Sequence, residues 1–227
     1  MADKPHVREA EAAAKGAAAT NVALRPILIG LILVVSFGIA AYLGTSPPRN
    51  TIPPELQGVL RPEPKALQDF GLVGSNGQPF TLERLEGKWT MLFFGYTYCP
   101  DICPTALAML SAVFRQLEPH PEVLGNTQVV FISVDPRRDT PERLAEYVAY
   151  FDERFTAATG ASEEVDNLVR QVGAGYQTEP ADSSGNYLVS HTGSVFLVDP
   201  GANLVGAFSF PHQAATILGQ YLKIREL

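Results

Sequence analysis

From about Leu67 onward, hydrophobic positions follow two spacings that predict alternating strands and helices. Continuous apolar runs stand at residues 88–96 (KWTMLFFGY) and 127–135 (TQVVFISVD), and a shorter one stands at 155–160 (FTAATG). A run without polar alternation indicates a strand that is buried on both faces. We therefore expect three strands in the interior of a sheet.

Segments with helical spacing follow each of these runs. After the first run, apolar residues recur three and four positions apart, at Leu107, Leu110, Val113, Phe114 and Leu117. Residues 140–151 follow the second run, with Thr140 as the expected cap and Pro141 at the first helical position. Residues 162–176 follow the third run, with Ser162 as the expected cap.

Two hairpins and a last helix complete the pattern. SNG at 75–77 separates two short apolar runs, and PGA at 200–202 separates SVFLVD from NLVGAFSF. A final helix is expected at 214–224 (AATILGQYLKI). This order of elements predicts a parallel core with an antiparallel edge. The expected fold class is α/β, a thioredoxin-like mixed sheet with flanking helices, over residues 67–227.

The longest apolar run lies nearer the amino end. Residues 27–44 (ILIGLILVVSFGIAAYLG) carry no charged side chain. At about 1.5 Å per residue, a helix of this length nearly crosses a hydrocarbon layer of roughly 30 Å, and flanking anchors or slight thinning complete the span. The run is longer than a typical signal-peptide core and lacks a clear cleavage site. We expect a single uncleaved transmembrane helix.

Charges on either side of this run set its expected orientation. Arg8, Lys15 and Arg25 precede it, whereas Arg49 stands alone close behind it, which places residues 1–26 in the cytoplasm. The first 15 residues also contain acidic side chains, which mitochondrial presequences avoid. The expected location is a bacterial inner membrane, with the carboxyl-terminal domain in the periplasm.

Residues 45–66 are rich in proline and poor in periodic apolar residues, which predicts a stiff spacer between membrane and domain.

The formal net charge of the chain is −7. Binding to nucleic acid needs clustered lysine and arginine, and none is visible in the sequence. We therefore expect no nucleic-acid partner.

The two cysteines of the chain, Cys99 and Cys103, follow the first buried run, at the edge where open α/β sheets place their ligands. A disulfide closing so short a loop would restrict the unfolded chain little, so a functional pair is favoured. Nearby amides at a helix start lower the pKa of thiols. Sulfurs four residues apart on a helical turn can hold one metal ion or form a disulfide after modest rearrangement.

The start of the following helix is open between two alternatives. Either Cys99 caps a helix with Pro100 at its first position, or Cys103 caps one that begins at Pro104. A helix that ran on through Pro104 would lose a hydrogen bond and clash, so we expect a tight turn and a restarted or kinked helix.

Two thiolates suit Cu(I), and an imidazole would complete a three-coordinate site. His191 is the favoured third ligand, because it precedes an antiparallel strand that starts at the edge where the parallel strands end. His6 lies across the expected membrane, His120 is at the far end of the first helix, and His212 opens the last helix.

Asp135 ends a parallel strand at the same edge. It can orient His191, act as an outer hydrogen-bond acceptor or supply a weak ligand. The alternative is that Asp135 or Asp139 organises the turn into the next helix. Tyr96 and Tyr98 are expected to line the site as packing residues.

Three segments together resemble the SCO/SenC family of membrane-tethered, thioredoxin-like proteins needed for cytochrome c oxidase assembly. They are FFGYTYCPDICP (93–104), VDPRRDTPE (134–142) and SHTGSVFLVDP (190–200). The resemblance implies a copper site from Cys99, Cys103 and His191. It also implies delivery of copper to the CuA centre of oxidase subunit II, reduction of that centre's cysteines, or both, and a periplasmic chaperone that donates the copper.

Three other readings remain open. A metal-independent periplasmic thiol:disulfide oxidoreductase is the main alternative, although thioredoxins use C-x-x-C. A peroxiredoxin would need proline and threonine where Leu92 and Tyr96 stand. A catalytic zinc site with two cysteines and a histidine is chemically allowed, but no acid to activate water is suggested.

Overall fold

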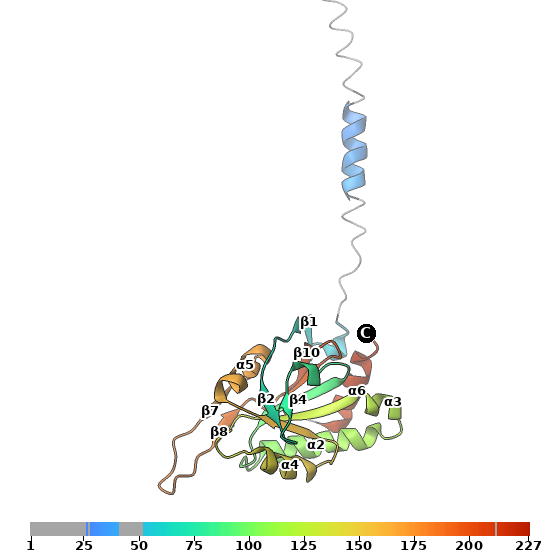
Figure 1. Cartoon of the computed structure of the whole chain (residues 1–227). Helices are drawn as coiled ribbons and strands as arrows, with labels where there is room; N and C mark the ends of the chain where they lie inside the picture. Colours follow the sequence, from blue (N-terminus) through green and yellow to red (C-terminus); the bar gives the residue numbers. More distant parts are fainter. Residues whose placement is uncertain (1–25, 27, 41–51, 212) are drawn as a thin grey trace, which may run out of the picture. The chain divides into compact units, whose positions relative to one another are not determined.

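A computed structural model describes residues 26, 28–40, 52–211 and 213–227 (Figure 1). The chain divides into two compact units, residues 1–51 and Ile52–Leu227. In the first unit, residues 28–40 are helical with exposed apolar side chains. Within the described residues, no helix combines the length and apolar character needed to cross a membrane. Residues 27 and 41–44 of the expected anchor lie outside the described residues.

The second unit is built on an eight-stranded sheet with strand order β1-β10-β9-β4-β5-β6-β2-β3. These strands are β1 (Leu60–Ala66), β2 (Leu72–Gly74), β3 (Pro79–Phe80), β4 (Trp89–Gly95), β5 (Thr127–Ser133), β6 (Thr156–Thr159), β9 (Val195–Val198) and β10 (Asn203–Phe208). The three central strands β4, β5 and β6 are parallel, and the outer strands are antiparallel to their neighbours. The predicted mixed sheet, with both predicted hairpins, is confirmed.

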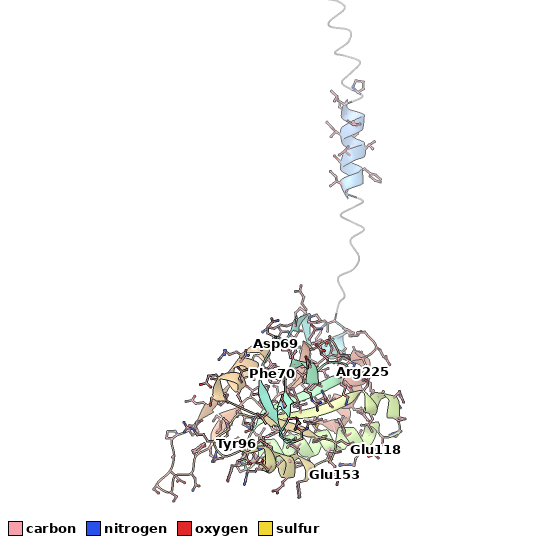
Figure 2. The ribbon with its side chains drawn as sticks, viewed as in Figure 1. Asp69, Phe70, Tyr96, Glu118, Glu153 and Arg225 are labelled. Carbon is pink, nitrogen blue, oxygen red and sulfur yellow. The ribbon has the colours of Figure 1, made fainter. Side chains whose placement is uncertain are left out.

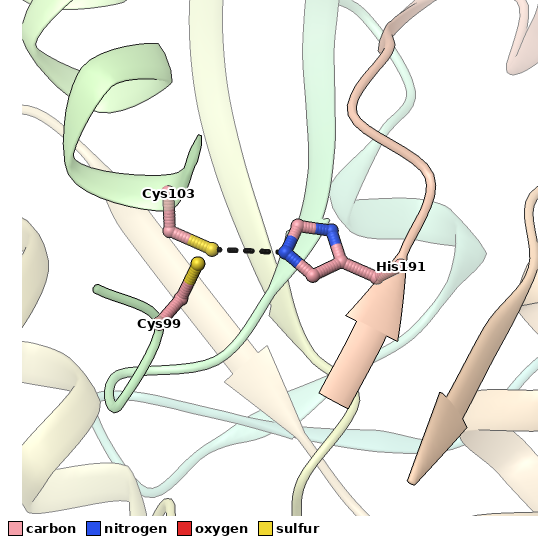
Figure 3. A group of neighbouring side chains, drawn as sticks. All are labelled: Cys99, Cys103 and His191. Carbon is pink, nitrogen blue, oxygen red and sulfur yellow. Dashed lines mark hydrogen bonds between the residues drawn. The ribbon is translucent and has the colours of Figure 1, made fainter. Parts of the chain in front are cut away.

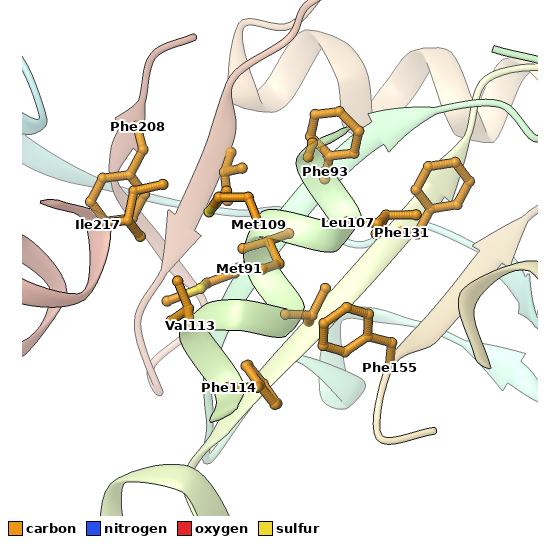
Figure 4. Close-up of a cluster of buried hydrophobic side chains, with 14 of the residues drawn as sticks. Met91, Phe93, Leu107, Met109, Val113, Phe114, Phe131, Phe155, Phe208 and Ile217 are labelled. Carbon is orange, nitrogen blue, oxygen red and sulfur yellow. The ribbon is translucent and has the colours of Figure 1, made fainter. Parts of the chain in front are cut away.

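Helices cover both faces of this sheet. They are α2 (Ile102–Leu117), α3 (Pro121–Gly125), α4 (Pro141–Ala149), α5 (Ser162–Val172) and α6 (Ala214–Ile224), with short 3-10 turns η1 (Pro54–Leu56) and η2 (Leu82–Arg84). Along β4, Met91 and Phe93 join the core beneath α2 and α6 (Figure 4), whereas Leu92 and Phe94 join a second core beneath α5. Successive strand residues point to opposite faces, and both faces are covered, so β4 reads as an unbroken apolar run.

The structure differs from the sequence prediction at the expected spacer. Residues 60–66 form the edge strand β1, which pairs with β10, and Leu56 is fully buried. A Cβ at Gly206 of β10 would lie 2.4 Å from the carbonyl oxygen of Val59, so the backbones meet closely there. Prolines are tolerated on an edge strand, where an amide can go unpaired, and they hid this strand in the pattern. The folded unit therefore begins at Ile52.

The helix after β4 begins at neither predicted place. Its first residue is Ile102 and its cap is Asp101. Pro104 is then the third helical residue, where an amide has no intrahelical partner, so the proline costs no hydrogen bond. Likewise, Ser162 is the first residue of α5 and not its cap. The predicted Thr140 cap of α4 is confirmed, because its side chain accepts a hydrogen bond from the backbone N–H of Arg143.

A separate two-stranded sheet was not predicted. Strands β7 (Tyr176–Thr178) and β8 (Val189–His191) pair antiparallel with each other. We call them, with the loop between them, the histidine hairpin. Figure 1 shows it at the end of the domain toward which β4 runs. Tyr96, just past β4, lies at this end, and Glu118, just past α2, lies at the opposite end (Figure 2).

Candidate metal centre

Three side chains from separate elements meet at the carboxyl end of β4 (Figure 3). Cys99 lies in the turn after β4, Cys103 in the first turn of α2, and His191 at the end of β8. One ligand atom from each residue lies within 4.8 Å of the other two. Sγ of Cys103 is 3.3 Å from Nε2 of His191. The structure thus brings together the three residues that the sequence suggests as metal ligands.

Gly95 makes room for one of the two sulfurs. It is the last residue of β4, and a Cβ there would lie 2.5 Å from Sγ of Cys103 and 2.8 Å from the ring of Phe131. Only a residue without a side chain lets the fully buried Cys103 approach the strand in this way. Gly95 was not predicted as a site residue; its signal in the sequence is a glycine inside an otherwise apolar strand, which often marks a close approach.

The imidazole of His191 is oriented by its own backbone and by two aromatic rings. Nδ1 lies 3.1 Å from the carbonyl oxygen of Thr192, which accepts the Nδ1 proton and leaves the lone pair of Nε2 facing the sulfurs. The rings of Phe93 and Tyr96 meet the imidazole edge to face, with centroids 6.0 and 5.9 Å away. Tyr96 therefore lines the site, as predicted.

The two thiols have opposite character. A hydrogen bond from Cys103, together with backbone amides at Asp101 and Cys103, lowers the pKa of the Cys99 thiol to about 3. The same hydrogen bond and burial raise the pKa of Cys103 above its usual range. Cys99 is partly exposed and Cys103 is buried. Without metal, the pair therefore holds one negative charge, on the sulfur that solvent can reach.

Asp135 does not accept a hydrogen bond from the His191 imidazole. Its carboxylate accepts hydrogen bonds from Nε of Arg138 and from the hydroxyl of Tyr187, the latter at 2.9 Å. The orienting acceptor is instead the Thr192 carbonyl. Asp135 also lies outside the three-residue group whose ligand atoms converge. The sequence placed Asp135 at the correct sheet edge but did not reveal which way its side chain points.

Asp139 organises the turn before α4, as the alternative reading held. It is fully buried and accepts hydrogen bonds from the backbone N–H and hydroxyl of Thr97, at 2.9 and 2.6 Å, and from the hydroxyl of Ser133 at 2.6 Å.

Tyr98, in contrast to the buried Tyr96, is 47% exposed. Its ring lies 4.2 Å from the guanidinium carbon of Arg143.

The remaining histidines have different surroundings or lie outside the described residues. His120 caps α3, just beyond the carboxyl end of α2. His6 and His212 lie outside the described part of the chain. Within that part, Cys99, Cys103 and His191 are the only converging group of potential ligands.

The donor set fits copper. Thiolate sulfurs are soft ligands that favour Cu(I), and imidazole nitrogen also binds copper. Structural zinc sites usually have four protein ligands, and the converging group supplies three. Thiolate ligands must be deprotonated to bind, and the lowered pKa of Cys99 meets that requirement.

Comparison with known sequences identifies related proteins. The sequence pattern of the SCO1/SenC family matches residues 59–225. A protein of Stutzerimonas stutzeri that is named for copper binding is 38% identical over 163 residues, covering 72% of this chain and 78% of that protein. The mouse mitochondrial SCO2 homolog is 39% identical over 132 residues, covering 58% of this chain and 51% of its own length. The chain thus spans about half the length of this mitochondrial relative.

Comparison with solved structures gives the same result. Arabidopsis thaliana ScoI with copper bound superposes with a TM-score of 0.65 at 35% identity, covering 70% of this chain and 98% of that one. Yeast Sco1 with copper bound gives 0.66 at 30% identity, covering 72% and 90%. Together with the donor set, these copper-bound structures support copper as the metal of the centre.

Proposed function

The chain belongs to the SCO1/SenC family, and from this premise we propose that it is a copper metallochaperone for the CuA centre of cytochrome c oxidase subunit II. The observation that carries the proposal is the convergence of Cys99, Cys103 and His191 within 4.8 Å. A related Sco protein is described as belonging to a family of cytochrome c oxidase assembly proteins.

The unequal exposure of the ligands supports a transfer route. Cys103 is buried, whereas Cys99 is partly exposed and is the more acidic thiol. A thiolate of the target protein therefore approaches the centre from the side of Cys99. In this scheme Cys99 is the first ligand to be exchanged, while Cys103 and His191 retain the cargo until the target supplies further ligands.

A second candidate function rests on the same thiols. The low pKa of the accessible Cys99 and the raised pKa of the buried Cys103 are the asymmetry that thiol:disulfide exchange uses. The Cys99 thiolate would attack a target disulfide, releasing one target thiolate and forming a mixed disulfide. Cys103, once deprotonated, would then displace the second target thiolate. The target gains two electrons and becomes a dithiol, and Cys99 and Cys103 form a disulfide.

The proposed location follows from residues 27–44. We place this run in a bacterial inner membrane as a single-pass anchor, with the domain in the periplasm, where a copper-donating chaperone loads it. Support comes from the absence of charge in the run and from the helical, apolar character of residues 28–40. A membrane-impermeant thiol reagent should label Cys99 in cells with a permeable outer membrane. Labelling only after lysis of the inner membrane would contradict this location.

Copper titration of the reduced full chain tests the metal site. Wild type should bind one Cu(I) per chain, and Cys99→Ser or Cys103→Ser should abolish tight binding. His191→Ala should weaken binding and alter the spectrum. Stoichiometric tight binding by either serine variant, or unchanged binding by His191→Ala, would contradict the site.

Transfer is tested by mixing the copper-loaded chain with the apo form of subunit II, its cysteines either reduced or oxidised. Metal and disulfide are followed separately. Copper movement to the reduced target supports the metallochaperone. Disulfide exchange with the oxidised target, without copper movement in either case, supports the oxidoreductase.

A further inference from the structure

The strand that carries His191 stands apart from the main sheet. Among the described residues, β8 pairs with β7 alone, and this pairing sets His191 opposite Tyr176. The two cysteines, in contrast, lie on backbone that continues directly from β4 into α2. Residues 192–194 join His191 to β9 of the main sheet. Beyond this connection, the distance between imidazole and sulfurs depends on contacts between the histidine hairpin and side chains of the rest of the domain.

Tyr187, two residues before β8, is attached at three points to the segment that follows β5. Its carbonyl oxygen accepts a hydrogen bond from Nη1 of Arg138 at 2.9 Å, and its ring centroid lies 3.6 Å from the guanidinium carbon. Its hydroxyl donates to Asp135 at 2.9 Å. Asp135 is 4% exposed and is ion-paired with Arg138. The start of β8 is thus fastened to an ion pair that is largely shielded from water.

The same guanidinium also faces the turn that carries Cys99. Its carbon lies 4.7 Å from the ring centroid of Tyr98 and 5.5 Å from that of Tyr96, within the range of cation–π attraction. Nη2 of Arg138 is buried and has no hydrogen-bond partner in the described part of the chain, as expected for a guanidinium held partly by ring faces. A planar guanidinium donates to oxygens and stacks on rings at once, whereas a lysine ammonium is a point charge.

We propose that Arg138 is a positioning residue of the copper centre. It joins Tyr187, at the start of the histidine-bearing strand, to Tyr96 and Tyr98, which precede Cys99. It thereby holds the His191 imidazole within reach of the sulfurs. The inference rests on the proposed function in one respect, namely that His191 binds copper. Without the guanidinium, Cys103 is still held in the core and Arg143 still contacts Tyr98 in the turn before Cys99, but the third ligand is held less firmly.

A double-mutant cycle tests whether Arg138 acts through His191. Cu(I) affinity is measured on the reduced full chain by competition with a chromophoric Cu(I) chelator, for wild type, Arg138→Gln, His191→Ala and the double variant. Arg138→Gln should weaken binding about tenfold, as is typical when a residue that supports a metal ligand is lost. In the His191→Ala background the same change should have little effect, because no imidazole remains to be positioned.

Two further measurements separate positioning from general stability. In the Cu(II)-loaded chain, Arg138→Gln should reduce the nitrogen hyperfine coupling from the imidazole, a signal that a loss of stability alone would not change. Arg138→Lys should restore little of the affinity. Arg154→Gln is the matched control, since Arg154 is also ion-paired, with Asp152, and lies 5.3 Å from the Phe114 ring, but it belongs to the loop after α4. Its copper affinity should equal that of wild type.

Tyr187→Leu provides the same test if Arg138→Gln does not fold, because it removes the stacked ring and the hydroxyl from a partly exposed residue. It too should weaken binding only when His191 is present. Wild-type affinity in a folded Arg138→Gln or Tyr187→Leu chain would overturn the inference, as would an equal loss in the His191→Ala background. Absence of Cu(I) binding by wild type would instead refute the proposed function.

Discussion

Replacing Gly95 by alanine should displace one of the two sulfurs of the metal centre. The new methyl carbon would lie 2.5 Å from Sγ of Cys103, whereas ordinary contact begins near 3.4 Å. The sulfur or the strand must therefore move by about 0.9 Å. The Cβ position is fixed by the backbone, and the ring of Phe131, 2.8 Å from the same position, crowds it from a second direction.

The magnitude of the effect follows from this displacement. Overpacking a core typically costs about 1–3 kcal/mol, which for a domain of this size lowers Tm by roughly 2–12 °C. Ligand distances in well-formed metal sites stay within about 0.2 Å of their preferred values, so the shift of Sγ is several times that tolerance. We expect Gly95→Ala to weaken Cu(I) binding by more than about tenfold, the loss typical of disturbed metal sites.

Thermal denaturation of the reduced apo chain and chelator competition for Cu(I) measure the two effects. Gly193→Ala is the control, because a Cβ there would meet its nearest atom, Cγ2 of Ile102, at an ordinary 3.5 Å. Gly193 also lies two residues from His191, so the control tests the same centre. If Gly95→Ala binds copper as tightly as wild type and melts at the same temperature, the reasoning about space around Cys103 is wrong.

Three further predictions concern the turns and the thiol around the centre. The pKa of Cys99 is lowered to about 3, so the stability that its thiolate contributes to the reduced apo chain is complete above the ordinary thiol pKa near 9 and is lost as pH falls toward 3. The difference in Tm between wild type and Cys99→Ser should therefore shrink from pH 8 to pH 5. A difference that stays constant would contradict the assignment of the charge to Cys99. Asp139→Ala leaves Thr97 and Ser133 without their buried acceptor. It should lower the free energy of unfolding, measured in urea, by about 2–4 kcal/mol, at the upper end for a lost buried hydrogen-bond partner. A loss below about 0.5 kcal/mol would mean that water replaces the carboxylate. Thr140→Ala removes the side-chain cap of α4 and should cost about 1 kcal/mol by the same assay, with Thr140→Ser retaining most of it.

Much of the sheet was predictable because burial on both faces leaves a clear mark in sequence. β4 and β5 read as unbroken apolar runs since α2 and α6 cover one face and α5 covers the other. β1 has no apolar run of this kind. It is an edge strand whose residues after Leu60 are exposed, and its prolines imitate a linker. The sequence pattern therefore predicts the interior of the sheet better than its border.

The sequence predicts at which edge of the sheet the metal centre lies. The order of strands places Cys99 and His191 at the same edge, and in the structure Nε2 of His191 lies 3.3 Å from the neighbouring Cys103. The same order of strands places Asp135 at this edge, but its carboxylate contacts Arg138 and Tyr187 and not the imidazole, because side chains at one edge point in several directions. Which ones converge depends on packing that the sequence pattern does not contain, such as the absence of a side chain at Gly95.

The ligands of the centre lie partly in the core of the domain and partly on the histidine hairpin, and this difference bears on how copper is released. Cys103 is fixed in the core between β4 and α2, so withdrawing its sulfur would disturb the main sheet. His191 lies on a hairpin whose strands pair with each other, and which is held to the domain by residues 192–194 leading into β9 and by Arg138, whose side chain donates to the Tyr187 carbonyl oxygen. Segments with few backbone bonds to the rest of a domain open at lower free energy than its core. After a target thiolate has replaced Cys99, the imidazole can therefore leave at lower cost than the Cys103 sulfur, and in our proposal the Arg138 contact contributes to that cost.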